Sequence, residues 1–213
     1  MNRKQLRARI EKSLVAIGDP ILLAEGFAKM KRTLRYQREC SSGEQWIIVD
    51  FKLPRYSDDP TLCHIELGIG ASFPDVNEMA VNLVDGNTQL VGFSPDVTYA
   101  FSVGLCGPEN ALKQWRPIDS DDLHSKIQDM ITYLRQFGLP FLAEYQTSAS
   151  LVRGYLNGDQ RFMKGHTFVL RVIAAALCTN QNNTAKEIAE RAFGTSHGIR
   201  RRYAVLFERL MTS

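Results

Sequence analysis

The sequence predicts an α+β fold in which an antiparallel meander of about four strands packs against an N-terminal helix and a C-terminal set of helices. Three runs rich in aromatic and β-branched residues follow one another between Thr33 and Gly70, and Gly, Ser, Pro and Asp residues separate them. Such runs, bounded by turn-forming residues, are typical of paired strands. Beyond Leu105 the apolar residues recur at helical spacing, so the helices are expected mainly after the sheet.

The four strands are expected over residues 33–39, 45–53, 62–70 and 98–105. In the second strand, alternate residues from Ile47 to Leu53 fall on one apolar face, which the core should cover. In the third, His64 and Glu66 fall on the opposite face. Residues 71–97 form a long connection with no clear pattern, which is usually a functional or mobile insertion, although residues 76–84 could form a short helix.

Helices are expected at both ends of the chain. Leu6 and Ile10 begin an apolar face over residues 3–17, and Gly18 followed by Pro20 should end that helix before a short second helical segment over residues 22–24. The later helices are expected over residues 120–137, 140–156, 167–178, 185–193 and 199–211. We therefore expect an α+β domain over residues 1–157 and a helical extension over residues 158–213 that docks on the same domain.

Composition predicts a globular protein of the cytoplasm. Of the 213 residues, 44% are hydrophobic and 23% are charged, which is ordinary for such proteins. The N-terminal residues have no secretory pattern, and the longest apolar run, residues 172–178, is far shorter than the roughly 20 residues that span a bilayer. Four scattered cysteines without a CxxC pair predict reduced thiols and neither a zinc site nor a disulfide framework. No membrane partner and no cofactor are expected.

Charge is distributed unevenly along the chain. Residues 44–122 contain 13 acidic and 4 basic side chains. Residues 1–12 contain five basic side chains and one acidic side chain. Residues 183–213 contain six basic and three acidic side chains. Basic ends around an acidic middle can steer a charged partner, while solvated acidic loops and basic helix faces explain the same pattern without one.

Five short stretches together resemble one bacterial family, the domain of unknown function 4304 family. These stretches are Gly26–Phe27, Trp46–Phe51, Ile65–Ile69, Trp115–Asp119 and Phe137–Leu142. The resemblance covers residues 3–157, and residues 71–97 depart from the family pattern. It implies an α+β fold and a bacterial intracellular setting. It implies no catalytic residues.

One polar face of the sheet offers candidate chemistry. Asp50, His64 and Glu66 could meet there beside Lys52, and a histidine with two carboxylates can bind a divalent metal or act as an acid and base pair. Paired charges on a solvated strand face explain the same residues. The chain has no nucleophile elbow, no phosphate-binding glycine loop and no HExxH motif, so the enzyme hypothesis rests on these three residues alone.

The C-terminal segment has the outline of a helix-turn-helix. Residues 185–191 are followed by a turn at residues 194–196 and by a helix that begins near Arg200, Arg201 and Arg202. In that motif the second helix enters the major groove of DNA while basic side chains bind phosphates. A plain terminal hairpin of two helices has the same outline. DNA binding is therefore an alternative hypothesis.

The first hypothesis is a non-enzymatic module that binds another protein through acidic loops. The candidate residues are Asp58, Asp59, Asp75 and Glu78. An immunity-type role, in which an acidic face masks a basic toxin, would suit this charge. The sequence does not specify the identity of the partner or the oligomeric state.

Overall fold

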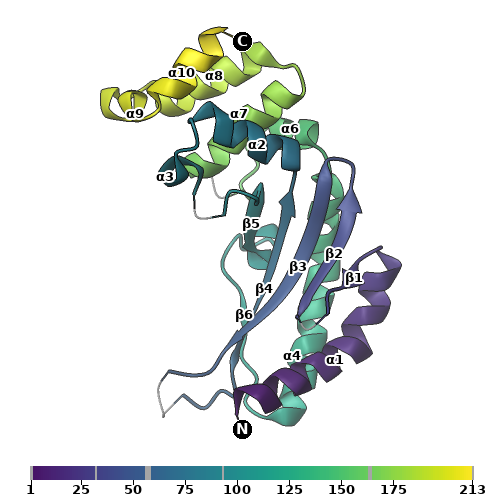
Figure 1. The fold of residues 1–213 in the computed structure, drawn as a ribbon. Helices are drawn as coiled ribbons and strands as arrows, with labels where there is room; N and C mark the ends of the chain where they lie inside the picture. The colour runs from purple at the N-terminus through teal and green to yellow at the C-terminus, as the bar shows by residue number, and fades with distance from the viewer. Residues whose placement is uncertain (1, 32, 56–58, 93, 163–164, 213) are drawn as a thin grey trace. The chain divides into compact units, whose positions relative to one another are not determined.

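The computed structural model describes residues 2–31, 33–55, 59–92, 94–162 and 165–212, and its fold is mixed α+β, as predicted (Figure 1). Six strands form one sheet in the order β1-β2-β3-β4-β5, with β6 paired to β4. The strands are β1 (Ala28–Lys29), β2 (Arg35–Cys40), β3 (Gly43–Lys52), β4 (His64–Ser72), β5 (Tyr99–Ser102) and β6 (Gln114–Trp115). Two of them, β1 and β6, have only two residues each and were not predicted.

Helices precede and follow the strands. They are α1 (Arg3–Ala24), α2 (Pro74–Leu83), α3 (Thr88–Val91), α4 (Ser120–Tyr133), α5 (Leu139–Glu144), α6 (Ser148–Leu156), α7 (His166–Cys178), α8 (Asn182–Phe193), α9 (His197–Arg202) and α10 (Ala204–Thr212). A 3₁₀ turn, η1 (Val103–Cys106), follows β5, and a π-helical turn, η2 (Leu134–Gly138), joins α4 to α5. Within the described ranges, every helix is too short or too polar to cross a lipid bilayer.

The chain divides into two compact units, which are described separately. Unit 1 contains residues 1–39, 45–70 and 101–143. Unit 2 contains residues 40–44, 71–100 and 144–213. This division differs from the predicted one, which placed a single boundary near residue 157, because each unit is assembled from three separate stretches of the chain.

In unit 1, α1 and α4 lie on the same side of the sheet (Figure 1). The buried positions of α1 recur every four residues: Leu6, Ile10, Leu14, Gly18 and Leu22. The predicted end at Gly18 is wrong, because this glycine is a contact point: a Cβ there would lie 3.2 Å from Ile131 Cδ1 of α4. Pro20 is tolerated on the exposed face, where water can bond the carbonyl of Ala16 that loses its N–H partner. The predicted separate segment over residues 22–24 is the last turn of the same helix.

The predicted alternation of the strands is confirmed over most of its length. The buried side chains are Ile47, Val49 and Phe51 on β3 and Ile65, Leu67 and Ile69 on β4. Leu53 was expected on the same apolar face, but it lies beyond the end of β3 and is 43% exposed. The predicted fourth strand ends at Ser102 and not at Leu105, because the Ser102 hydroxyl accepts a hydrogen bond from Gly104 N–H and starts the 3₁₀ turn.

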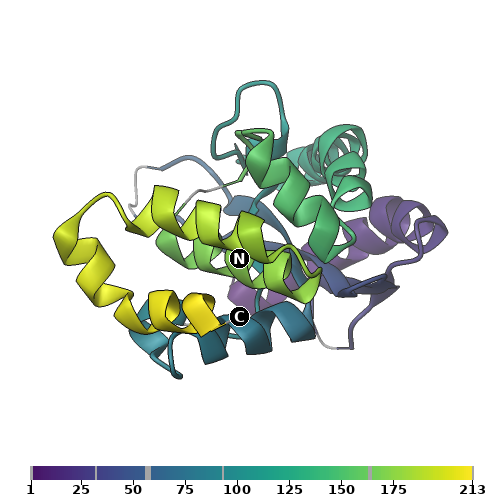
Figure 2. The ribbon, with the colours of Figure 1, turned by 90° about the horizontal axis from the view of Figure 1, so that it is seen from above.

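Unit 2 is built around α7, which is buried on nearly all sides, as its composition predicted. Helices α2, α6 and α8 pack against it (Figure 2). Residues 71–97 are therefore not a structureless insertion: they end β4 and then form α2 and α3, both in contact with α7. The buried guanidinium of Arg171 on α7 fixes this segment by donating hydrogen bonds to the carbonyls of Val91, at 2.9 Å, and Ser94, at 3.0 Å.

Two predicted helices are each divided in the structure. The helix expected over residues 140–156 becomes α5 and α6, since Thr147 interrupts it and caps α6 in a reciprocal capping box with Ser150. The helix expected over residues 199–211 becomes α9 and α10, with the break at Tyr203. The Tyr203 ring stacks on Phe193 of α8 with a centroid distance of 4.0 Å. This stacking packs the chain at the break against α8.

Candidate binding groove between β6 and α4

The three residues of the predicted metal site have separate partners. Glu66 forms an ion pair with Lys52 at 3.0 Å, and hydrogen bonds from Lys52 and Gln114 lower the pKa of Glu66 below its ordinary value. His64 Nε2 lies 3.0 Å from Asp59 Oδ2, and the Asp50 carboxylate accepts a hydrogen bond from the N–H of its neighbour in the chain. Among the described residues, His, Cys, Asp and Glu side chains form no group of three or more that could hold a metal ion.

The predicted acidic surface is divided between the two units. Asp58 lies outside the described residues. Asp59 belongs to unit 1, where hydrogen bonds from Thr61 and then from His64 lower its pKa. Asp75 and Glu78 are exposed on α2 in unit 2. The role of these four residues in binding stays a prediction.

The predicted DNA-binding arginines lie on a short helix. Arg200 forms an ion pair with Glu190 at 2.7 Å, and its guanidinium lies 4.2 Å from the centroid of the Phe207 ring. Arg201 and Arg202 are exposed. Helix α9 has six residues, which at about 1.5 Å each makes a helix about 9 Å long. It would offer less than two turns to a major groove, so DNA binding at this hairpin stays a prediction.

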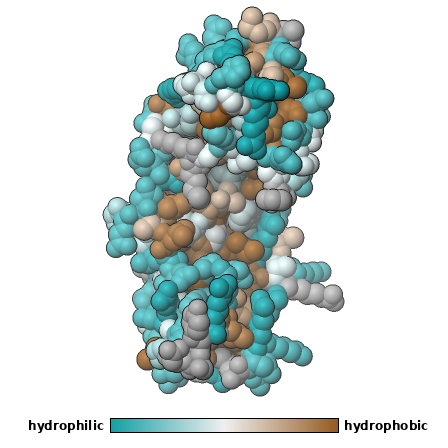
Figure 3. Space-filling model, turned by 90° about the vertical axis from the view of Figure 1, so that its left-hand side faces the viewer, coloured by the Kyte–Doolittle hydropathy of each residue, from teal (hydrophilic) through white to brown (hydrophobic). Residues whose placement is uncertain are grey.

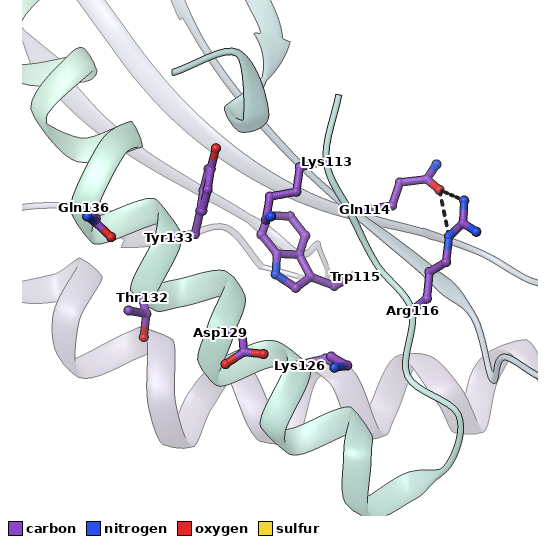
Figure 4. Close-up of a pocket in the computed structure, with 9 residues that line it drawn as sticks. All are labelled: Lys113, Gln114, Trp115, Arg116, Lys126, Asp129, Thr132, Tyr133 and Gln136. Atoms are coloured by element: carbon purple, nitrogen blue, oxygen red, sulfur yellow. Dashed lines mark hydrogen bonds between the residues drawn. The ribbon is translucent and has the colours of Figure 1, made fainter. Parts of the chain in front are cut away.

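A groove in unit 1 gathers polar, aromatic and basic side chains that the sequence analysis did not single out. Its volume is about 520 Å³. Residues 113–116, which include β6, form one wall, and residues of α4 and η2 between Lys126 and Gln136 form the other (Figure 4). Strand β6 is placed there by its pairing with β4, in which Trp115 lies opposite Ile65.

Two aromatic rings form the floor of this groove. The rings of Trp115 and Tyr133 meet edge to face, with a centroid distance of 5.9 Å. The ammonium group of Lys113 lies 5.9 Å from the centre of the Trp115 ring and 4.9 Å from that of Tyr133, which is within the range of a cation–π interaction. Burial raises the pKa of Tyr133, so this side chain stays a neutral phenol. The floor therefore holds the Lys113 side chain in place without a carboxylate.

A chain of hydrogen bonds across three strands orients the other basic residue of the β6 wall. Glu66, fixed by Lys52 of β3, accepts a hydrogen bond of 2.7 Å from the side-chain amide of Gln114. The amide oxygen of Gln114 then accepts from Arg116, with Nη2 at 2.9 Å and Nε at 3.3 Å (Figure 4). The guanidinium of Arg116 is thus held by a neutral acceptor, and its charge is not cancelled.

The electrostatics of the groove favour an anionic ligand. Its lining contains three basic side chains and one carboxylate, that of Asp129. Lys126 has a carboxylate 3.8 Å away, on Asp122, whereas the part of the chain that the structure describes gives neither Lys113 nor Arg116 an ion-pair partner. The described lining contains no histidine, cysteine or serine.

Exposed apolar side chains lie in the same segment as the groove. Leu112 and Ile118, at either end of the β6 wall, are 79% and 60% exposed. Figure 3 views the molecule from the left-hand side of Figure 1. It shows hydrophobic residues gathered among hydrophilic ones on this face. An apolar area rimmed by charges is typical of a protein interaction site.

Comparisons of the chain with protein-family models, with curated proteins and with solved structures found no match. The resemblance to the domain of unknown function 4304 family therefore stays a prediction. The candidate site rests on geometry alone. One local signal for it was present in the sequence: Lys113, Trp115 and Arg116 stand together between two exposed apolar residues. Tryptophan and arginine are enriched among the residues that contribute most to binding at protein interfaces.

Proposed function

We propose that this protein is a non-enzymatic protein-binding module whose groove between β6 and α4 receives a partner that presents carboxylates beside apolar side chains. The observation that carries the proposal is the pair of oriented cations, Lys113 and Arg116, that no carboxylate neutralises among the described residues. Complementary charge would give such a contact its specificity and its rate of association. The exposed Leu112 and Ile118 would supply apolar area next to these charges.

The surroundings of the groove favour a protein over a nucleic acid as its ligand. The first ten residues of α4 and its cap contain four acidic side chains, which are Asp119, Asp121, Asp122 and Asp129. A nucleic acid carries its charge along its whole backbone, so these carboxylates would repel it more than a protein surface with a few carboxylates opposite Lys113 and Arg116. Trp115 is only 5% exposed, so it offers little area on which a base could stack. The setting that this proposal assumes is a bacterial cytoplasm, as composition and the family resemblance predict.

The proposal is tested by affinity capture from the cells that express the protein, at low salt and after nuclease treatment. Three proteins are compared by quantitative mass spectrometry: the wild type, the groove variant Lys113→Glu/Arg116→Glu, and the matched control Arg201→Glu/Arg202→Glu, which reverses two exposed charges in unit 2. We expect a protein that the wild type and the control retain in equal amount and that the groove variant loses. The same partner, purified, should bind the groove variant at least about tenfold more weakly, and the difference should shrink as salt is raised.

Three results would contradict the proposal. The groove variant could retain every partner of the wild type, or nuclease could remove all co-eluting material. Alternatively, binding of the protein partner could be lost only in the control variant, which would assign the interaction to α9 and not to the groove.

A further inference from the structure

Among the described residues, no strand pairs with the end of β3 beyond Val49 on the side of β2. Val49 N–H donates a hydrogen bond of 2.9 Å to the carbonyl of Leu34, just before β2 begins. Since the backbone groups of an antiparallel strand face the same neighbour at every second residue, the N–H and carbonyl of Phe51 face that side as well. The preceding chain has turned away by then, as the hydrogen bond from Thr33 N–H to the Met30 carbonyl shows.

The unpaired end of β3 is protected by a local side chain. The N–H of Phe51 donates to Oδ1 of Asp50, its neighbour in the chain, at 2.8 Å. A charged side chain on an edge strand hinders the addition of another strand. The protection is local and reversible, because rotation of one side chain would free the N–H.

A groove rich in basic residues lies along this strand edge. Its volume is about 600 Å³, and α1 contributes Arg3, Lys4 and Arg7 to its lining. The guanidinium of Arg3 lies 5.5 Å from the centre of the Phe51 ring, so it stands directly beside the open edge. Asp50 is the one carboxylate in the described lining. This groove is separate from the one between β6 and α4, with which it shares no residue.

We infer that this groove is a second binding site, which takes an extended acidic peptide segment by strand addition to β3. A backbone carbonyl of the peptide would replace the Asp50 carboxylate on Phe51 N–H, and its acidic side chains would meet the cations of α1. Strand addition supplies affinity through the main chain, while charge selects the sequence. The inference does not depend on the groove between β6 and α4.

The strand edge distinguishes this ligand from a nucleic acid. Phosphates could satisfy the three cations, but they cannot use the N–H and the carbonyl of Phe51 as a strand does. A peptide can satisfy both. A test must therefore separate main-chain pairing from charge attraction.

The test uses a fluorescein-labelled peptide of alternating Val and Glu residues and measures fluorescence anisotropy. The same peptide with N-methyl groups on alternate backbone amides keeps its charge but cannot pair as a strand. We expect the unmodified peptide to bind at least about tenfold more tightly than the N-methylated one. The variant Arg3→Glu/Lys4→Glu should also bind at least about tenfold more weakly, and acidic residues in the first turn of a helix should not harm its folding. Arg201→Glu/Arg202→Glu, which reverses two exposed charges on α9, should bind the peptide as the wild type does.

A second variant tests the role of Asp50. Asp50→Ala removes both the acceptor that protects Phe51 N–H and the carboxylate that repels the peptide. We expect a several-fold gain in affinity for the unmodified peptide and a smaller gain for the N-methylated one. Equal binding of the two peptides, or no effect of Arg3→Glu/Lys4→Glu, would overturn the inference. So would binding of a single-stranded oligonucleotide, with the same dependence on Arg3 and Lys4, by a protein that does not bind the peptide.

Discussion

The guanidinium of Arg38 donates two hydrogen bonds to the side-chain oxygen of Gln45, from Nε at 3.0 Å and from Nη2 at 2.9 Å. Gln45 is fully buried, and its amide nitrogen donates to the carbonyl of Leu142 at 2.6 Å. Arg38 also donates to the carbonyl of Glu25, at the end of α1. One polar residue in the core of unit 1 thereby joins β2 and β3 to α5, and through Arg38 to α1.

Replacing Gln45 with Leu should destabilise unit 1 by about 1–3 kcal/mol, because Arg38 and the Leu142 carbonyl would each lose the buried hydrogen bonds that Gln45 makes with them. Urea unfolding followed by tryptophan fluorescence suits this measurement, since Trp46 and Trp115 both belong to unit 1. Gln128→Leu, on the exposed face of α4, is the matched control and should change the free energy of unfolding by less than about 0.5 kcal/mol. Equal stability of the two variants would show that the buried hydrogen bonds contribute nothing.

The alternation along β3 predicts that the Gln45 side chain faces the core, but it does not predict the hydrogen-bond partners of that side chain. The alternation of Ile47 and Val49 places position 45 on the core side of β3. Its partner, Leu142, is 97 residues away, and no local pattern connects the two. The start of α1 at Arg3 agrees with the prediction, but its C-terminal end does not, for the same reason. Gly18 is a typical stop signal, yet it lies inside the helix, where it packs against Ile131 of α4.

Local sequence patterns could not predict the groove between β6 and α4 either. Strand β6 has two residues, which is too short for any period to be visible, and it exists because Trp115 pairs with Ile65 far earlier in the chain. Sequence reasoning did identify Lys52 and Glu66 as neighbours on one strand face, and the structure confirms their ion pair. It could not show that Glu66 orients Arg116 through Gln114, because that chain of contacts spans three strands.

Acid should weaken unit 2 through Asp159. Burial raises the pKa of this carboxyl, but hydrogen bonds from Arg161 and Tyr145 outweigh the burial, so that its pKa in the folded protein lies below the ordinary value. A carboxyl with a lowered pKa stabilises the fold above its unfolded pKa of about 3.9, and this stabilisation is lost as the pH falls through the folded pKa. Asp159→Asn should therefore be less stable than the wild type at neutral pH, and the difference should narrow below about pH 4.

Circular dichroism of the whole protein during urea unfolding, at several pH values, measures this difference. Asp96→Asn, in the same unit, is the control, since no side-chain hydrogen bond to the Asp96 carboxylate occurs among the described residues. A constant difference between wild type and Asp159→Asn from neutral to acidic pH would contradict the prediction.

Thiol reactivity should separate Cys63 from the more accessible cysteines. Cys63 is fully buried, and this burial raises the pKa of its thiol to about 11, so the reactive thiolate is scarce at neutral pH. Cys40 is half-buried. Labelling of the native protein with iodoacetamide, followed by mass spectrometry of its peptides, should modify Cys40 first, and Cys63 should be modified only once urea unfolds unit 1. Rapid labelling of Cys63 in the native protein would show that this part of the sheet opens.

Gly107 should control the shape of the groove through Tyr133. A Cβ at position 107 would overlap the Tyr133 hydroxyl and lie 2.7 Å from its ring carbon Cζ, while the backbone at Gly107 has ordinary dihedral angles that alanine accepts. Gly107→Ala should therefore move the Tyr133 ring, and with it the contact with Lys113, without straining the backbone. We expect a changed emission of Trp115, which touches the same ring, and weaker binding of the partner that the groove retains.

A double substitution distinguishes this steric effect from general damage to the fold. Tyr133→Phe removes the hydroxyl that the new methyl group would meet first. In the Tyr133→Phe background, Gly107→Ala should therefore lower the affinity for the partner and the free energy of unfolding by less than it does in the wild type. Gly198→Ala in α9, where the nearest atom lies 4.0 Å from the added carbon, is the control and should not lower the free energy of unfolding, because alanine is favoured over glycine in a helix. Additive effects of the two substitutions would mean that Gly107 acts on the groove by a route other than Tyr133.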